Sequence, residues 1–122
     1  MAGLTQALQQ STLDTLFPTT GATDHIAYSA NGTTESGAIA RTPIGATGWA
    51  SATAATPSVK ANANALTSAA AASGATLTHF AIYTAVSAGT QRTDWTALSA
   101  SKTVTTGDQL TWAIGACAVT LD

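Results

Sequence analysis

Charged side chains are scarce in this sequence. Four lysine and arginine residues and six aspartate and glutamate residues make up 8% of the 122 positions, with a net charge of −2; about 25% is usual in soluble domains. No basic stripe is present that could neutralise phosphates, so we expect no nucleic-acid partner. No run of like charge and no stretch of about 18 apolar residues occurs, so we expect no membrane partner.

Cysteine and large apolar residues are also rare. The single cysteine, Cys117, permits neither an intrachain disulfide nor a thiolate metal cluster, and we expect it to be a small buried hydrophobe. Apolar residues form 45% of the chain, but 28 of them are alanine, and only three Trp, two Tyr and two Phe are present. So thin a core predicts a homo-oligomer, in which subunit contacts supply part of the missing burial.

Small residues dominate instead. Together, 28 Ala, 24 Thr, 10 Ser and 10 Gly make up more than half of the chain. The apolar content and low net charge argue against disorder, and the length suits a single domain. The opening MAGLTQALQQ lacks the basic and apolar regions of a secretory signal. We therefore expect the chain to be made in a cytoplasm without a secretion signal of its own.

The N-terminal segment predicts a short helix over residues 3–17, ended by Pro18. This helix either lies on its own domain or docks as an arm onto a neighbouring subunit. Its apolar stripe at helical spacing comprises Leu4, Leu8, Thr12 and Leu16, widened by Leu13 and Phe17.

Alternation with a period of two predicts strands along the rest of the chain. Residues 24–30 place Ile26 and Tyr28 on one face, and residues 77–85 do the same with Phe80 and Ile82. Pro43 makes a strand over 38–44 an edge strand. Further strands are expected over 48–53, over 58–66 with Val59, Ala61, Ala63 and Ala65 on one face, over 95–100, over 110–114 and over 117–121.

Short strands separated by turn signals are typical of a mainly β domain. The turns are expected at Asn31-Gly32 and at Gly107-Asp108, a loop or a single turn over 68–74, and a bulge or bend at Gly115. We predict an antiparallel β-sandwich or jelly-roll-like domain with a short N-terminal helix. Residues 1–20 would form the helix or arm, and residues 21–122 a single β-sandwich domain.

The few titratable residues suggest no catalytic or metal site. No two acids have a spacing that indicates general acid–base work, and Asp94 and Asp108 fall in predicted turns, where Asp is favoured. His25 and His79 fall on separate predicted strands, and a metal site needs three or more ligands that converge. We therefore predict no catalytic residue, no metal and no cofactor, and we expect no small-molecule ligand.

The three tryptophans are the side chains best suited to contacts with a partner or a glycan. Trp112 keeps step with Leu110 and Ile114, so we expect it in the core. Trp95 opens a strand and stays undecided, and Trp49, next to Gly48, is the best candidate for an interface. Packing remains the alternative for both, because aromatic residues dominate cores as well as interfaces.

Several segments together resemble a family of small structural proteins of tailed bacteriophages, described as capsid decoration, head fibre or tail fibre proteins. The resemblance covers nearly the whole chain, and the C-terminal segment is its most specific part because Gly107-Asp108 and Gly115 keep the matching spacing. The first strand departs from the family pattern, with YSANGTTES in place of HTADPG. The matching segments are LDTLF at 13–17, HIAYSANGTTES at 25–36, Ala40-Arg41, LTHFAIYTA at 77–85 and KTVTTGDQLTWAIGACAVTLD at 102–122.

The resemblance implies a virion component made in the host cytoplasm. Our first hypothesis is a non-enzymatic capsid decoration protein, a trimer that binds the major capsid protein on the outer head surface. The alternative is a minor tail or fibre protein that touches the host, through glycan stacking on Trp49 or Trp95. A third, a small depolymerase, would need a carboxylate pair in a cleft. The candidate interface residues are Leu4, Leu8, Phe17, Trp49 and Trp95.

Overall fold

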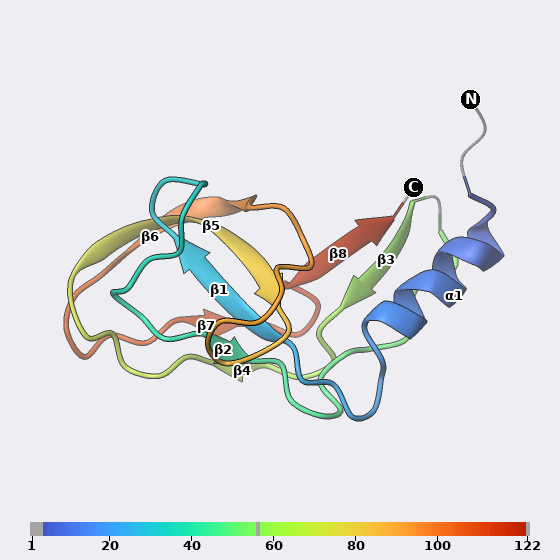
Figure 1. Ribbon diagram of the computed structural model, residues 1–122, viewed down its shortest axis with the longest axis horizontal. Coiled ribbons are helices and arrows are strands. Elements are labelled where there is room, and N and C mark those ends of the chain that lie inside the picture. The colour runs from blue at the N-terminus through green and yellow to red at the C-terminus, as the bar shows by residue number, and fades with distance from the viewer. Residues whose placement is uncertain (1–3, 56, 122) are drawn as a thin grey trace. The chain divides into compact units, whose positions relative to one another are not determined.

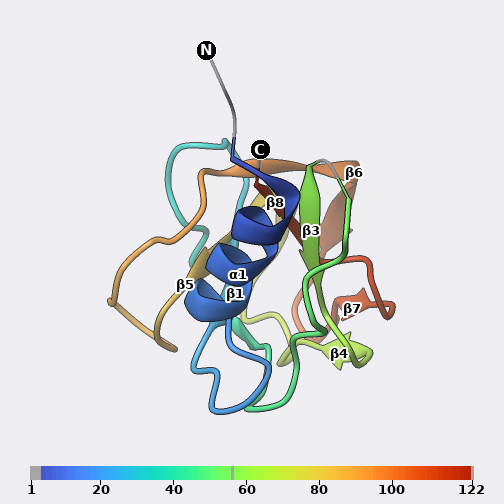
Figure 2. The same ribbon diagram turned by 90° about the vertical axis from the view of Figure 1, so that its right-hand side faces the viewer.

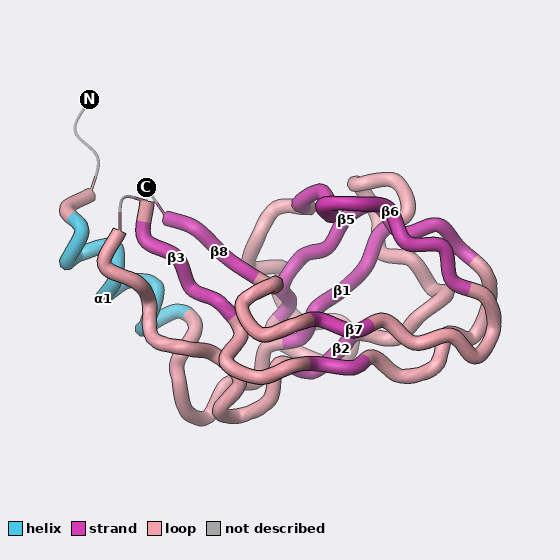
Figure 3. The backbone as a smooth tube through the Cα atoms, turned by 180° about the vertical axis from the view of Figure 1, so that it is seen from behind, coloured by secondary structure: helices cyan, strands magenta, loops and turns pink. Residues whose placement is uncertain are grey.

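The structure is a computed structural model that describes residues 4–55 and 57–121. Its elements alternate with long loops (Figures 1 and 3) and fall into two compact units, the first formed by residues 1–22, 44–65 and 112–122 and the second by residues 23–43 and 66–111. In chain order the elements are α1 (Gln6–Leu16), β1 (His25–Ser29), β2 (Thr42–Pro43), β3 (Ser58–Ala61), β4 (Leu66–Thr67), β5 (Ala75–Tyr83), β6 (Thr96–Val104), β7 (Thr111–Trp112) and β8 (Ala118–Leu121).

The second unit is built on a four-stranded antiparallel sheet in the order β2-β1-β5-β6. Strand β1 pairs along its whole length with β5, so that Tyr28 lies opposite Phe80 and Ile26 opposite Ile82. The sheet buries these side chains, as the alternation in the sequence predicted. Strands β5 and β6 are nine residues each, and their register shifts between Leu77 and His79.

Strand β2 is an edge strand, as Pro43 predicted. It is only two residues long, because proline has no N–H to continue a ladder. Its Thr42 is fully buried and forms a 2.6 Å hydrogen bond with the Tyr28 hydroxyl. Ala38 and Ile39 are buried beside it, although they form no strand.

The predicted loop and turns of the second unit are confirmed. Residues 68–74 contain neither helix nor strand. Their first half is held by hydrogen bonds from the Ser68 N–H to Leu110 O (2.8 Å) and from the Ala71 N–H to Asp108 O (2.7 Å). The Asp108 carboxylate accepts from the Thr105 N–H at 2.9 Å in the turn that precedes β7. The alanines in this segment therefore do not make it helical, because these backbone hydrogen bonds hold it in a loop conformation.

The first unit packs α1 against β3, which pairs with β8 (Figure 2). Thr5 caps the helix, its hydroxyl accepting from the Leu8 N–H at 3.3 Å. The inner face of α1 is formed by Gln9, Leu13 and Phe17, all at most 3% exposed. The buried glutamine bridges elements, since its side chain accepts from Ser58 N–H at 3.0 Å and donates to Leu4 O at 2.9 Å.

The fold class predicted from the sequence is confirmed: mainly antiparallel β structure with one short N-terminal helix, and no sheet closed into a barrel among the described residues. The β-sandwich-like description fits this arrangement. The proposed boundary between an arm, 1–20, and a domain, 21–122, stays a prediction. In the first unit, the arm packs with 44–65 and 112–122.

Several local predictions were wrong. Trp112, expected in the core, is half-buried, and the predicted strand over 38–44 shrinks to β2. Residues 48–53 form no strand, and only an isolated bridge joins Trp49 to Asn62. The predicted strand 58–66 is split, and it is Ser58 and Lys60, not Val59 and Ala61, that are buried. The strand at 110–114 shrinks to β7, leaving Ile114 70% exposed.

A further error concerns the helix face. Leu4, Leu8 and Leu16 are 40%, 49% and 45% exposed, while Leu13 and Phe17 are buried. The buried face is thus rotated away from the leucine stripe, because Gln9 on it bonds to the backbone of Ser58. The spacing of apolar residues could not predict this face, because a buried glutamine, Gln9, lies on it.

Candidate contact surfaces

The five candidate interface residues lie in different environments. Leu4 and Leu8 are exposed on and just before α1, and Trp95 is half-buried ahead of β6. Phe17 and Trp49 are 3% and 2% exposed, with ring centroids 5.2 Å apart and planes tilted by 59°. In this structure, Phe17 and Trp49 therefore pack against each other inside the first unit, the alternative that the sequence also allowed for Trp49.

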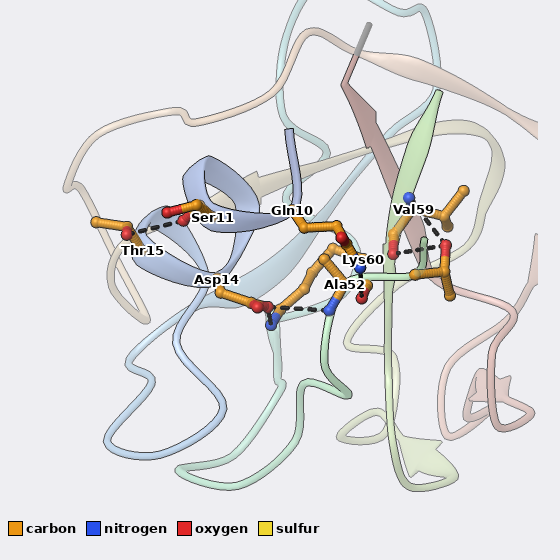
Figure 4. A network of polar contacts seen from close by, with 8 residues as sticks. Gln10, Ser11, Asp14, Thr15, Ala52, Val59 and Lys60 are labelled. Atoms are coloured by element: carbon orange, nitrogen blue, oxygen red, sulfur yellow. Dashed lines mark hydrogen bonds and ion pairs between the residues drawn. The ribbon is translucent and has the colours of Figure 1, made fainter. Parts of the chain in front are cut away.

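A polar network holds α1 to its own unit (Figure 4). Asp14 on α1 accepts from Lys60 Nζ at 2.7 Å and from the Ala52 N–H at 2.9 Å. The Gln10 side chain donates to Ala52 O at 3.2 Å. The polar contacts of α1 with its own unit therefore use the Asp14 and Gln10 side chains. The exposed leucines of the helix take no part in them.

The ion pair in this network is asymmetric. The Lys60 side chain is fully buried, whereas that of Asp14 is 43% exposed. The hydrogen bond from Lys60, and after it the one from the Ala52 N–H, lowers the pKa of Asp14 below its ordinary value. The sequence assigned no role to Lys60, and its partner on the helix explains its burial.

A second buried cation organises one edge of the second unit. Arg41, 8% exposed, donates to both carboxylate oxygens of Glu35 at 2.7 and 2.8 Å and to the carbonyls of Ala85 and Ala88 at 2.9 and 2.7 Å. The hydrogen bond with Glu35 raises the pKa of Arg41 above its ordinary value. One guanidinium thus ties the 31–37 loop to the loop that follows β5.

The same guanidinium supports an aromatic pair. Its carbon lies 3.9 Å from the ring centroid of Tyr83, a cation–π contact. The Tyr83 ring lies 6.1 Å from that of Trp95, tilted by 51°, and its hydroxyl donates to Gln91 Oε1 at 3.2 Å. Both rings are half-buried. Arg41 therefore holds the Tyr83 ring in place, while part of the aromatic surface of the pair reaches solvent.

Sequence reasoning found only Trp95 of this cluster. Tyr83 was placed on a strand without a role, and the Arg41–Glu35 pair was not foreseen. One signal was available: Arg41 is one of only four basic residues, and it follows Ile39 and Ala40 directly before the predicted edge position at Pro43. A lone arginine in such a setting is rarely buried without a carboxylate partner.

The histidines, acids and cysteine occupy structural positions. His25 Nδ1 donates to Thr23 O at 2.8 Å, and His79 Nδ1 bonds with the Thr78 hydroxyl at 2.8 Å. Burial raises the pKa of the Cys117 thiol to about 12, which suits the small buried hydrophobe predicted for it. Within residues 4–55 and 57–121, no three His, Cys, Asp or Glu side chains are placed to hold a metal ion.

The comparison with protein families decides the class of protein. The profile of the family described as "Podophage GP4 fiber I protein gp80" matches residues 4–120. The chain belongs to this family. It is therefore a bacteriophage virion structural protein, as the resemblance of its segments predicted.

The match with the fibre I family spans the helix and all eight strands up to Thr120. None of the curated proteins compared with the chain matches it. In the part of the chain that the structure describes, no helix has the length and apolarity needed to cross a membrane.

Proposed function

We propose that this chain is a non-enzymatic fibre component of the phage particle, the alternative hypothesis drawn from the sequence. The observation that carries the proposal is the match to a fibre protein family over residues 4–120. The structure supports it, because the most organised side-chain clusters bind and position rather than form a catalytic constellation: Arg41 holds loops and rings, and Lys60 holds the helix.

The proposal includes self-association of the chain, with a trimer favoured. A fibre needs symmetric subunit contacts, and a closed symmetric assembly uses the same surface on every copy. The outer face of α1 supplies an apolar surface for this, formed by Leu4, Leu8 and Leu16. Because the polar network holds the other side of the helix, these leucines can contact a second copy without unfolding the first unit.

Capsid decoration through the major capsid protein is the role against which the fibre proposal is tested. The test is the copy number of the chain per particle, measured by quantitative mass spectrometry of purified virions against the major capsid protein. The fibre role predicts a small number, a multiple of the fibre symmetry. Hundreds of copies in a simple ratio to capsid subunits would overturn it in favour of head decoration. Absence of the chain from purified particles would overturn both roles.

A further inference from the structure

The 31–37 loop after β1 begins with an asparagine directly before a glycine, Asn31-Gly32, and the asparagine is exposed. Such a pair loses its side-chain amide more readily than other asparagines, because glycine has no side chain to shield its backbone nitrogen. In this reaction the Gly32 nitrogen gives its proton to a solvent base and attacks Cγ of Asn31, the bond from Cγ to Nδ2 breaks, and ammonia leaves. Water then opens the succinimide ring, which leaves aspartate or isoaspartate at position 31.

The attacking nitrogen is engaged in the folded chain. The Gly32 N–H donates to Ser29 Oγ at 2.9 Å. Ser29 is the last residue of β1, is fully buried and pairs with His79 of β5, so its hydroxyl has a fixed position. That hydroxyl also accepts from the Asn31 N–H at 3.2 Å and donates to Thr34 O at 2.6 Å, which uses both of its lone pairs and its proton. An N–H bonded to a fixed oxygen must give up that bond before it can react.

The amide group under attack is held as well. Asn31 Oδ1 accepts from the backbone N–H groups of Thr33 and Thr34, both at 2.9 Å, and its Nδ2 donates to Thr34 Oγ1 at 3.0 Å. Closure of the succinimide ring needs the bond from Cβ to Cγ to eclipse the backbone carbonyl carbon of Asn31, which takes the side chain off its staggered rotamer. That rotation breaks the three hydrogen bonds, and their loss adds to the barrier of the reaction.

The fold needs both residues of this pair. Gly32 has a φ of 76°, a conformation that favours glycine, and a Cβ there would lie 3.0 Å from Cε1 of His79. The Asn31 side chain supplies the oxygen that two backbone N–H groups of the loop require. A less reactive pair would therefore cost loop structure, whereas the hydrogen bonds around Asn31 and Gly32 restrain the reactive one.

We propose that Asn31-Gly32 is a latent modification site. In the folded chain the loop blocks succinimide formation, with Ser29 as the positioning residue, and Asn31 is deamidated once the loop opens. Deamidation replaces the Nδ2 donor with a carboxylate, which accepts only, so the hydrogen bond to Thr34 Oγ1 is lost and a negative charge is added beside Glu35. Because ammonia leaves, the change is irreversible and marks every chain whose loop has opened. The inference is independent of the proposed function.

The experiment measures the rate of deamidation at Asn31 in the full chain. The protein is incubated at mildly alkaline pH, folded in buffer and unfolded in urea. Peptide mapping by mass spectrometry follows the mass gained when the amide becomes a carboxyl group, and chromatography separates the isoaspartate form. Asn62 and Asn64, each followed by alanine, serve as internal references in the same digest. We expect the folded chain to react at least about tenfold more slowly than the unfolded chain.

The main variant is Ser29→Ala, which removes the acceptor of the Gly32 N–H. Ser36→Ala is the matched control in the same loop, since the Ser36 hydroxyl accepts from the Ala38 N–H at 3.2 Å. Thr34→Val, at an exposed position, removes the acceptor of Asn31 Nδ2. For the folded proteins we expect Ser29→Ala to speed deamidation about five- to tenfold, Thr34→Val to speed it less, and Ser36→Ala to stay within about twofold of the parent. In urea all four chains should react at one rate.

A general loss of stability is separated from this specific effect. The urea titration of each variant gives its unfolded fraction, and hence the rate expected from global unfolding alone. NMR hydrogen exchange at the Gly32 N–H reports directly on the hydrogen bond that Ser29 accepts. We expect this exchange to be slow in the parent chain and faster in Ser29→Ala.

Three results would overturn the inference: equal rates of deamidation in the folded and unfolded parent chain, a Ser29→Ala rate that its unfolded fraction explains, or equal acceleration by Ser29→Ala and Ser36→Ala. If Ser29→Ala does not fold, the parent chain and Thr34→Val decide. A Gly32 N–H that exchanges in the parent as fast as in urea, or a Thr34→Val rate equal to that of the parent, would then count against it.

Discussion

The Asp14–Lys60 pair shows how one residue's burial depends on a partner far along the chain. Lys60 has no exposed side-chain surface, while Asp14 keeps 43%. Removing the carboxylate leaves an ammonium buried without its partner, which costs far more than removing the ammonium from a solvated carboxylate. Substitution of Asp14 should therefore lower the free energy of unfolding more than substitution of Lys60.

We predict that Asp14→Ala lowers the free energy of unfolding by about 3 kcal/mol, whereas Lys60→Met, which keeps the volume of the side chain, changes it by less than about 1 kcal/mol. Urea denaturation of both variants followed by circular dichroism measures the difference. Equal losses of unfolding free energy in the two variants would contradict the claim that Asp14 stabilises the fold by compensating the buried charge of Lys60.

The same pair makes stability depend on pH. The folded-state pKa of Asp14 is below its unfolded value, so its contribution is complete above a pH of about 4 and is lost as pH falls through the lowered folded pKa. We predict that Asp14→Asn flattens this acid limb of the unfolding free energy, measured by urea titrations between neutral pH and the acid limit. An unchanged acid limb in Asp14→Asn would assign the loss to other carboxylates.

At the scale of elements, α1 is a helix with two working faces. Its inner face joins Gln9, Leu13 and Phe17 to the β3 segment and to Trp49, and its outer face carries Leu4, Leu8 and Leu16. The inner face contributes to the stability of the first unit, and the outer face is exposed to contacts with other chains. Substitutions on the two faces should therefore separate stability from assembly.

Trp49 packs against the inner face of α1. We predict that Trp49→Ala lowers the free energy of unfolding by about 3–5 kcal/mol, because it removes a ring that is 2% exposed and leaves a cavity against Phe17. Thermal and urea unfolding measure the loss. A change below about 1 kcal/mol would mean that this ring contact is not part of the core.

On the outer face, we predict that Leu8→Ser shifts the stability of the isolated chain by no more than about 0.5 kcal/mol and lowers its oligomeric state. Light scattering coupled to size-exclusion chromatography measures the mass. Thr15→Ala on the same helix, exposed and outside the leucine set, is the control. A mass unaffected by Leu8→Ser would place the subunit contact elsewhere.

How far the sequence predicts these elements depends on what stabilises each one. The alternation in 24–30 and 77–85 was sufficient for β1 and β5, because their apolar faces pack directly against the core of the sheet. It failed for β3, where Lys60 is buried by an ion pair, and for α1, where a glutamine lies on the inner face. Pairing of polar side chains across distant segments leaves no periodic signal.

The candidate surfaces divide in the same way. Trp95 could be selected from the sequence as an apolar residue without an evident core role. Leu8 could be selected as part of an apolar helix stripe that either lies on its own domain or docks onto a neighbouring subunit. The residues that support Trp95 could not be predicted from the sequence, because Arg41, Glu35 and Tyr83 meet only through strand pairing and loop closure. A composition with so few charges makes each charged residue informative, and here three of the ion pairs turn out to fix elements in place.

At the scale of the whole molecule, the chain presents apolar surface in both of its units. The outer face of α1 in the first unit suits contacts between copies, and the Tyr83–Trp95 pair in the second unit is half-buried. Repeating a weak single site on every copy of a symmetric assembly increases its avidity without any new contact. A small, charge-poor domain is suited to such repetition, since charge is depleted at the centres of interfaces.

The most direct test of the fibre role is the position of the chain on the particle. Electron microscopy of intact virions labelled with gold-conjugated antibody against this chain measures it. The account predicts label on fibres projecting from the particle, at positions related by symmetry. Label spread evenly over the head surface would contradict the fibre role and establish the chain as a capsid decoration protein.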